Sequence, residues 1–320
     1  MPQDSHIYRL RNLGLPVMKS SEDFANYTKL SASRIRLLHL RADKFYKVYR
    51  LPKKSGGTRL IAQPSRELKA LQGWILRNIL DKLRASDQSK GFEIGSSILD
   101  NAAPHTGANF ILNIDLEDFF PSIKANRIFS IFRSIGYNKE LCVLLTNLCT
   151  YSGRLPQGAP TSPKLANLTC AQLDARIQGY AGPKGIIYTR YADDITLSAQ
   201  TATKIYKARY FLDYLIADEG FTINRQKTRV YGTMSRKCVT GLVVSESAVG
   251  IGREKYREIR AQIHHLFSGK ADSYRYLNGL LAFCFSVDTK SYRRAYKYMR
   301  KLQEKYPNSN AMNSIIPEKE

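Results

Sequence analysis

The stretch from Tyr188 to Ser198 constrains the fold of this chain more than any other part of the sequence. A β-branched and aromatic run leads into Ala192-Asp193-Asp194, and an apolar run follows, which predicts a β-hairpin with two adjacent carboxylates at its tip. Neighbouring residues of a strand point to opposite faces, so Asp193 and Asp194 cannot both be surface residues of one face. Acids in a turn usually reflect turn chemistry alone, because Asp hydrogen-bonds to its own backbone there. The pair therefore needs further context before it indicates a catalytic site.

A second acidic strand end lies upstream of the hairpin. Residues 110–116 predict an apolar strand that contains Asp115 and runs into further acids. A carboxylate inside an apolar strand is costly to bury unless a cation compensates its charge. Carboxylates brought together raise each other's pKa, and a pair of Mg²⁺ ions, which prefer oxygen ligands, removes that penalty. Asp115, Asp193 and Asp194 together therefore predict a two-metal centre for nucleotidyl transfer.

The charge of the chain indicates the kind of partner. Lys and Arg number 50 against 27 Asp and Glu, a net charge of +23, which favours nucleic acid, with an anionic membrane surface as the weaker alternative. No apolar run is long enough to span a bilayer, and the N-terminus has no signal-peptide pattern, so no membrane partner is expected. Five scattered cysteines without a C-x-x-C pair indicate reduced thiols and predict a cytoplasmic protein.

Local patterns predict the other elements. Gly56 and Gly57 lie inside a basic segment, Lys53–Ile61, and predict a hairpin that could hold phosphates, although a solvated loop fits these residues equally well. A helix is expected after Pro64-Ser65, and Ser31 or Ser33 is expected to cap an earlier one. Further helices are expected near residues 121–135, after the loop 155–163 and before Gly220, followed by a basic turn with Lys227 and a strand pair over 238–244.

The sequence after Gly252 is basic and helical. Its cations alternate with aromatic residues, a pattern that suits tracking of a phosphate backbone and stacking on bases, with a solvated face as the alternative. The residues predicted here to bind RNA are Arg253, Lys255, Tyr256, Arg260 and His264. His105, by contrast, has no second His or Cys nearby, so taken alone it indicates a structural histidine and not a metal ligand.

Three blocks of the sequence resemble successive motifs of reverse transcriptases. They are Ile-Asp-Leu-Glu-Asp-Phe-Phe at 114–120, Leu-Pro-Gln-Gly-Ala-Pro-Thr-Ser-Pro at 155–163 and Tyr-Ala-Asp-Asp at 191–194. Two further blocks resemble the N-A-x-x-H and V-T-G signatures of retron reverse transcriptases: Asn101-Ala102 with His105, and Val239-Thr240-Gly241. The resemblance covers roughly residues 50 to 300, so the chain is similar to bacterial retron reverse transcriptases in all five blocks.

The resemblance implies a role for each matching residue. Asp115, Asp193 and Asp194 would hold two Mg²⁺ ions, with Mn²⁺ as a substitute, and the carbonyl of Leu116 would add an oxygen ligand. Phe120 would collide with a ribose 2′-OH and so favour dNTPs. The other implied nucleotide contacts are Lys53, Arg59, Gln157 and Lys227. The two signature blocks, with Asn101, His105, Val239, Thr240 and Gly241, are implied to recognise RNA.

The fold implied by the resemblance is α+β, the right hand of polymerases, with fingers, a palm with an antiparallel sheet, and a helical thumb. The expected domains are residues 1–108 (N-terminal helical extension and fingers), 109–240 (palm, with a fingers segment near 125–158) and 241–320 (thumb, a basic helical RNA-binding region). The implied partners are dNTPs and a cognate structured non-coding RNA, which the enzyme copies into branched msDNA from the 2′-OH of a guanosine. An effector protein of an antiphage defence system is also implied. Only 80 residues follow residue 240, so removal of the RNA template is expected to need host RNase H.

Two alternatives remain open on the sequence alone. The first is a reverse transcriptase of another lineage, similar to those encoded by group II introns, against which stand the short thumb and the two retron-like signatures. The second is a non-catalytic RNA-binding scaffold with a polymerase-like palm, against which stand the three acids and Gln157.

Overall fold

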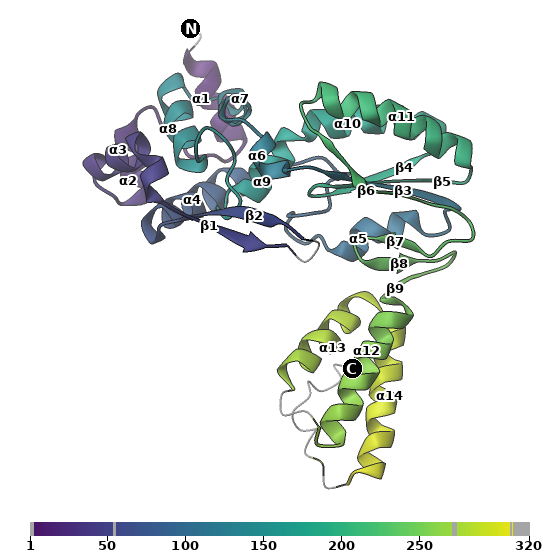
Figure 1. Ribbon diagram of the computed structural model, residues 1–320. Helices are drawn as coiled ribbons and strands as arrows, with labels where there is room; N and C mark the ends of the chain where they lie inside the picture. The colour runs from purple at the N-terminus through teal and green to yellow at the C-terminus, as the bar shows by residue number, and fades with distance from the viewer. Residues whose placement is uncertain (1–2, 54–55, 271–273, 308, 310–320) are drawn as a thin grey trace. The chain divides into compact units, whose positions relative to one another are not determined.

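A computed structural model describes residues 3–53, 56–270, 274–307 and 309, without the side chains of residues 3–6. The chain divides into two compact units (Figure 1). The first contains residues 1–96, 114–195 and 206–228, and the second contains residues 97–113, 196–205 and 229–320. The boundaries expected at 108 and 240 do not coincide with this division, and the assignment of fingers, palm and thumb stays a prediction.

The N-terminal part of the first unit consists of helices and one hairpin. Serine caps start three of the helices, because Ser20, Ser31 and Ser65 each accept a hydrogen bond from the amide three residues further on. The cap at Ser31 and the helix after Ser65 are thus confirmed. The elements are α1 (Gln3–Asn12), α2 (Ser21–Thr28), α3 (Ala32–Leu40), η1 (Ala42–Phe45), β1 (Tyr46–Pro52), β2 (Thr58–Pro64), α4 (Arg66–Asn78) and η2 (Leu80–Lys82).

Strands β1 and β2 form the expected basic hairpin. They are antiparallel, with Pro52 opposite Thr58 at the last pair before the turn. Gly56 and Gly57 have φ angles of 87° and 77°, the left-handed region that glycine enters without strain. Residues 54 and 55 lie outside the described residues, and Lys53 is the last described residue before them.

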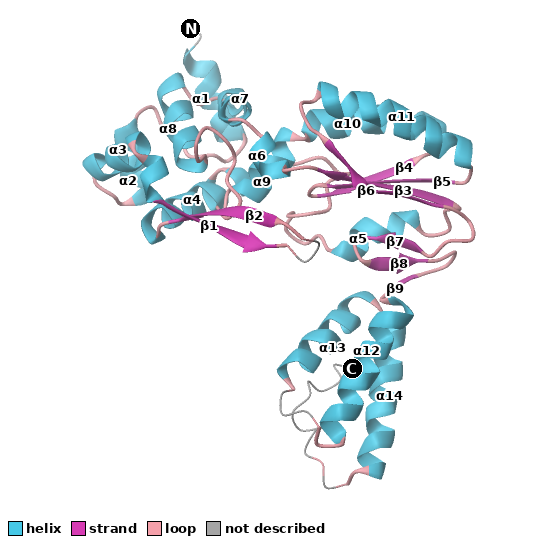
Figure 2. Cartoon of the chain, viewed as in Figure 1, coloured by secondary structure: helices cyan, strands magenta, loops and turns pink. Residues whose placement is uncertain are grey.

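A four-stranded sheet has the order β4-β5-β3-β6 (Figure 2). Its strands are β3 (Phe110–Leu116), β4 (Ile187–Tyr191), β5 (Asp194–Ala199) and β6 (Ile223–Tyr231). Over residues 113–116 of β3 the even-numbered residues, Ile114 and Leu116, are buried, while Asn113 and Asp115 are only partly buried. This alternation turns the Asp115 side chain away from the apolar face.

The other helices of the first unit lie between β3 and β4 in the sequence, or directly after β5. The helix expected near residue 121 begins later, at Ala125, because a separate short turn precedes it and Lys124 takes an extended conformation. Helices α10 and α11 lie side by side in Figure 1, and the rings of Tyr180 and Phe211 stack between them at 4.1 Å. These elements are α6 (Phe119–Ser122), α7 (Ala125–Ile135), α8 (Lys139–Cys149), α9 (Ser162–Thr169), α10 (Ala171–Ala181), η4 (Gly182–Lys184) and α11 (Ala202–Asp218).

The second unit has a core of its own. Three C-terminal helices pack together, and the predicted strand pair through 238–244 is confirmed as β7 and β8, with Val239 opposite Leu242. One apolar cluster joins these helices to α5 and β8, through residues that include Ala102, Val239, Ile259 and Leu281. The elements are α5 (Ile98–Ala102), η3 (Ala103–His105), β7 (Lys237–Val239), β8 (Leu242–Val244), β9 (Val249–Gly250), α12 (Gly252–Phe267), α13 (Arg275–Val287) and α14 (Thr289–Lys305).

Two findings bear on the expectations from composition. No helix within the described residues is both long and apolar enough to cross a bilayer. The five cysteines are free thiols, four of them buried and Cys238 partly buried, as the scattered spacing predicts.

Candidate active site

The hairpin predicted at residues 188–198 is present, with Ala192 and Asp193 in the turn between β4 and β5. Asp194 is the first residue of β5. Ala192 has a φ angle of 57°, which is uncommon for a residue with a side chain, and it is only 5% exposed. The two acids are therefore carried by a tight and partly buried turn.

Strand β3 brings Asp115 to this turn. The amide nitrogen of Leu116 donates a hydrogen bond to the carbonyl oxygen of Asp193 at 3.1 Å. Asp115 immediately precedes that amide in the chain, and β3 is the neighbour of β5 in the sheet. Two segments far apart in sequence thus meet at the point where the carboxylates are found.

The carboxylates affect each other electrostatically. Burial, followed by the charges of Asp193 and Asp115, raises the pKa of Asp194 to about 7. Burial also raises the pKa of Asp193, the charge of Asp115 adds to that rise, and Lys227 and Arg59 oppose it. Acids that share a small, poorly solvated volume hold protons more tightly, and a cation bound among them would release those protons.

Lys227 already places one positive charge on this cluster. Its Nζ lies 3.0 Å from both carboxylate oxygens of Asp115. The hydrogen bond to Asp115 is the main reason that the pKa of Lys227 is raised. The sequence predicted a turn here, but Lys227 belongs to β6, so its side chain projects from the strand that neighbours β3.

The donor chemistry of the cluster suits hard divalent cations, since all its side-chain donors are carboxylate oxygens. Within the described residues, however, no group of three or more His, Cys, Asp or Glu side chains is arranged so that it could hold a metal ion as it stands. Both carboxylate oxygens of Asp115 are bonded to the ammonium group of Lys227. The residues fit the expected metals in kind, and binding would require Asp115 to exchange Lys227 for the ion.

The residues expected to contact the nucleotide lie in the same unit. Loop 155–158 pairs with β2, since the amide of Ala62 donates to the carbonyl of Gln157 at 2.9 Å. A side chain at Gly158 would lie 2.9 Å from the Ala62 carbonyl, so the close approach requires glycine. Arg59 on β2 is exposed and its charge reaches Asp193. Lys53 is also exposed, at the end of the described part of the hairpin.

Phe120 lies in a group of aromatic rings beside the acids. Its ring centroid is 5.4 Å from that of Phe119 and 6.1 Å from that of Phe92, which in turn lies 6.4 Å from Tyr191. Phe92 was not singled out from the sequence. It is 44% exposed and has a φ angle of 61°, so a strained backbone presents its ring to solvent next to the expected sugar gate.

The two retron-like signature blocks meet inside the second unit. Asn101 Nδ2 donates to Thr240 Oγ1 at 2.5 Å, and His105 Nδ1 lies 2.7 Å from Ser198 Oγ. Asn101, His105 and Val239 are fully buried, and their part in RNA recognition stays a prediction. Burial lowers the pKa of His105 to about 4, which keeps the ring neutral. Thr240 and the exposed Gly241 form a turn with φ angles of 49° and 82°. The buried residues of the two blocks would affect RNA recognition by fixing the conformation of this turn.

The other residues predicted to bind RNA lie on α12, and several have partners within the second unit. Arg253 is exposed, whereas Lys255 pairs with Glu258 at 2.9 Å. Arg260 stacks on the ring of Tyr298, and Arg294 on the ring of Tyr256, across the contact between α12 and α14. The ring of His264 has an edge contact with Tyr306. The tyrosines therefore hold the cations in place within the bundle, a role that the alternation of residue types did not reveal.

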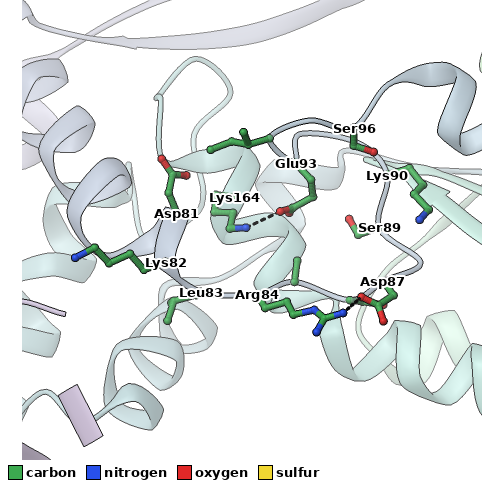
Figure 3. A pocket seen from close by; sticks show the side chains of 13 residues that line it. Asp81, Lys82, Leu83, Arg84, Asp87, Ser89, Lys90, Glu93, Ser96 and Lys164 are labelled. Atoms are coloured by element: carbon green, nitrogen blue, oxygen red, sulfur yellow. Dashed lines mark hydrogen bonds and ion pairs between the residues drawn. The ribbon is translucent and has the colours of Figure 1, made fainter. Parts of the chain in front are cut away.

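A polar pocket of about 420 Å³ lies elsewhere in the first unit (Figure 3). It is lined by residues 81–87, 89, 90, 93, 94, 96 and Lys164, none of which belongs to the acid cluster. Two of its four cations form ion pairs, Lys164 with Glu93 and Arg84 with Asp87, each at 2.6 Å.

Known proteins place these features in a family. The sequence profile described as "Reverse transcriptase (RNA-dependent DNA polymerase)" matches residues 51–277. The retron Ec86 reverse transcriptase of Escherichia coli is 58% identical over 301 residues, which cover 93% of this chain and 94% of that protein. The retron Mx65 reverse transcriptase of Myxococcus xanthus is 36% identical over 299 residues, covering 86% of this chain and 70% of that protein. The match to a solved structure of telomerase from Candida albicans covers 84% of this chain and 60% of that one, with 13% identity and a TM-score of 0.48.

These relationships, together with an acid cluster on an α+β fold, define an RNA-directed DNA polymerase with the architecture of the reverse transcriptases. Within that class, the chain belongs to the retron reverse transcriptases. Enzymes of this family copy an RNA template with dNTPs and use divalent metal ions.

Proposed function

We propose that this enzyme copies a cognate structured non-coding RNA into branched msDNA, starting from the 2′-OH of a guanosine in that RNA. The kinship with the retron enzymes of Escherichia coli and Myxococcus xanthus supports this proposal. A role in antiphage defence with an effector protein, and removal of the template by host RNase H, belong to the same proposal.

The proposed centre consists of Asp115, Asp193 and Asp194, with the carbonyl of Leu116. The observation that carries it is the hydrogen bond from Leu116 to Asp193, which joins the two acidic segments. Two Mg²⁺ ions, with Mn²⁺ as a substitute, would supply Lewis acidity at the attacking hydroxyl and at the leaving pyrophosphate. The carboxylates would hold the ions and, at neutral pH, would give up the proton that the raised pKa of Asp194 retains in their absence.

The surrounding residues would bind and orient the nucleotide. Arg59 and Lys53 on the basic hairpin would bind the triphosphate, and Lys227, once displaced from Asp115, would bind the leaving phosphates. Gln157, held to β2 through its carbonyl, would contact the nucleotide and template. Phe120 would exclude a 2′-OH from the sugar site, because its ring is fixed between Phe119 and Phe92.

The RNA would be held by the basic surface of the second unit. Arg253 and the cations that stack on tyrosines, Arg260 among them, would contact phosphates along α12 and α14. Lys255, Tyr256 and His264 would support that surface from their contacts within the bundle. Thr240 and Gly241 would present the turn that Asn101 and His105 fix from inside.

Primer extension on a primed RNA with dNTPs and Mg²⁺ tests the catalytic assignment. We expect Asp193→Ala to lose essentially all incorporation while RNA binding, measured by fluorescence anisotropy, stays within about twofold. Asp118→Asn is the matched control, because this exposed acid lies three residues after Asp115, and Asn tolerates its left-handed φ angle of 41°. Incorporation that survives Asp193→Ala would refute the assignment. A product with RNA and DNA joined through a 2′–5′ linkage, recovered from cells that express the chain with its neighbouring RNA, would support the branched product.

A further inference from the structure

Among the residues that the structure describes, the largest fully buried side chain carries a charge. Arg190 lies on β4, two residues before Ala192 in the catalytic turn, and has 0% exposure. An isolated ion in the interior is costly, so the groups around the guanidinium have to compensate it.

Asp174 on α10 compensates the charge of Arg190. Arg190 Nε donates to Asp174 Oδ1 at 2.8 Å and Nη2 donates to Oδ2 at 2.7 Å, so the two planar groups meet along two parallel bonds. The hydroxyl of Tyr188 donates to Asp174 Oδ1 at 2.6 Å, and Asp174 is itself fully buried. This geometry fixes the orientation of the guanidinium plane.

The remaining face of the guanidinium points to the catalytic turn. Arg190 Nη1 donates to the carbonyl oxygen of Ala192 at 3.0 Å and to Asn167 Oδ1 at 3.1 Å. The peptide group of that carbonyl also contains the amide nitrogen of Asp193. A bond to it therefore holds the backbone at the point where Ala192 adopts its left-handed φ angle and the chain turns to present both acids.

The other side of the same turn is enclosed by the loop at Gly91. A side chain at Gly91 would lie 2.7 Å from the amide nitrogen of Ala192, so the two backbones are in close contact. Asn167 Nδ2 donates to the Gly91 carbonyl at 2.7 Å and to Glu93 at 2.8 Å, and Glu93 also accepts from Lys164 (Figure 3). The network that begins at Asp174 thus reaches the turn both through Arg190 and through Asn167.

We propose that Arg190, oriented by Asp174, is a positioning residue that holds the Ala192 carbonyl and thereby places Asp193 and Asp194 for metal binding. A well-packed apolar pair is often at least as stable as a buried ion pair, so fold stability alone gives a weak reason for a charge at this position. The directed donors of the Arg190 guanidinium give a stronger reason for this residue, since a carbonyl in a strained turn needs a partner with fixed geometry. The inference rests on the proposed role of Asp193 and Asp194.

Two variants test the positioning role. Arg190→Lys keeps the charge but cannot bond to Asp174 twice and to Ala192 as well, because a single ammonium replaces the planar fork. The triple variant R190M/D174L/Y188F replaces three buried polar side chains that bond to one another with apolar side chains of similar size. Arg127→Lys is the matched control, because Arg127 is a partly buried arginine that also donates to main-chain carbonyls, those of Glu219 and Thr169, neither of which belongs to the catalytic turn.

We expect both Arg190 variants to fold, as judged by a cooperative thermal transition, and to bind RNA as the unchanged enzyme does. Their kcat should fall by about 100-fold, as for a misplacement of catalytic groups by about 1 Å, with a smaller change in KM for dNTP. Mn²⁺ binding to the variants without nucleotide, followed by electron paramagnetic resonance, should weaken several-fold, and Arg127→Lys should change neither quantity. Wild-type kcat and Mn²⁺ affinity in a folded Arg190 variant, or equal losses in Arg127→Lys, would overturn the proposal. If Asp193→Ala retained activity, the proposed function would fail first, which separates the two outcomes.

Discussion

The amide of Leu116 and the carbonyl of Asp193 form a hydrogen bond of 3.1 Å that links two acidic segments separated by several helices in the sequence. Through this bond the strand that contains Asp115 and the turn that contains Asp193 become one structural element. Burial and the acidic neighbours raise the pKa of Asp193 and that of Asp194. A cluster that retains a proton near neutral pH gains free energy when a divalent cation replaces that proton.

The ion pair of Lys227 with Asp115 predicts competition between the lysine and the metal. With Lys227→Met, Asp115 no longer has a competing cation, so the Mg²⁺ concentration for half-maximal activity should fall about threefold to tenfold. The KM for dNTP should rise, because Lys227 no longer meets the leaving phosphates. Steady-state titrations of Mg²⁺ and dNTP measure the two effects separately.

Arg225→Met is the control for the loss of a positive charge on the same strand, because Arg225 pairs with Asp213 instead of the acid cluster. It should leave the Mg²⁺ requirement unchanged. An increased Mg²⁺ requirement in Lys227→Met would show that the lysine assists metal binding and does not compete with it.

The ring of Phe120 predicts the discrimination between dNTPs and NTPs. Phe120→Ala removes the group expected to collide with the 2′-OH, so the ratio of kcat/KM for dGTP over GTP should fall by about 10- to 100-fold, the range set by steric contacts in a pocket. Incorporation of single nucleotides on a primed RNA gives this ratio. Phe132→Leu is the control, because it alters a fully buried phenylalanine of α7 and should lower stability without changing the ratio. Equal ratios in Phe120→Ala and the unchanged enzyme would place the gate elsewhere.

The buried neutral His105 predicts a dependence of stability on pH. Its pKa is about 4 in the folded state and about 6.5 in an unfolded chain, so between these values the unfolded chain binds more protons. The free energy of unfolding therefore has its full value above pH 6.5 as far as His105 is concerned. It decreases by up to about 3 kcal/mol as the pH falls from 6.5 toward 4. Urea unfolding at pH 7.5 and pH 5 should show a smaller loss in His105→Gln than in the unchanged enzyme. An identical loss in both would show that other groups set the acid sensitivity.

The acid hairpin, the strand with Asp115 and the strand pair at 238–244 could be predicted from the sequence, because each combines β-branched residues with a turn signal over a short range. The cap at Ser31 and the helix after Ser65 could also be predicted from local sequence. The start of α7 was placed too early, because the aromatic turn Phe119–Ser122 continues into the helix pattern without a break in composition.

Apart from the meeting of Asp115 with the acid hairpin, contacts between distant segments could not be predicted in this way. The sequence predicts a turn at Lys227, whereas the structure has strand β6 there. The charged residues of this segment hide its strand character, because Lys227 pairs with Asp115 on the neighbouring strand. The buried pair of Arg190 and Asp174 was also missed. A charged residue inside the apolar strand Ile187–Tyr191 was the available signal, by the same reasoning that singled out Asp115. The burial of Asn101, His105 and Val239 depends on tertiary packing, which a signature block does not encode.

The central claim is that Asp115 and Asp193 bind divalent cations together, and the most direct test counts Mn²⁺ ions bound to the enzyme with a primed RNA and a non-hydrolysable dNTP analogue. Electron paramagnetic resonance should give two bound ions in the unchanged enzyme and in Asp118→Asn, and a loss of affinity of at least about tenfold in both Asp115→Asn and Asp193→Asn. Two tightly bound ions in either of these last variants would contradict the account.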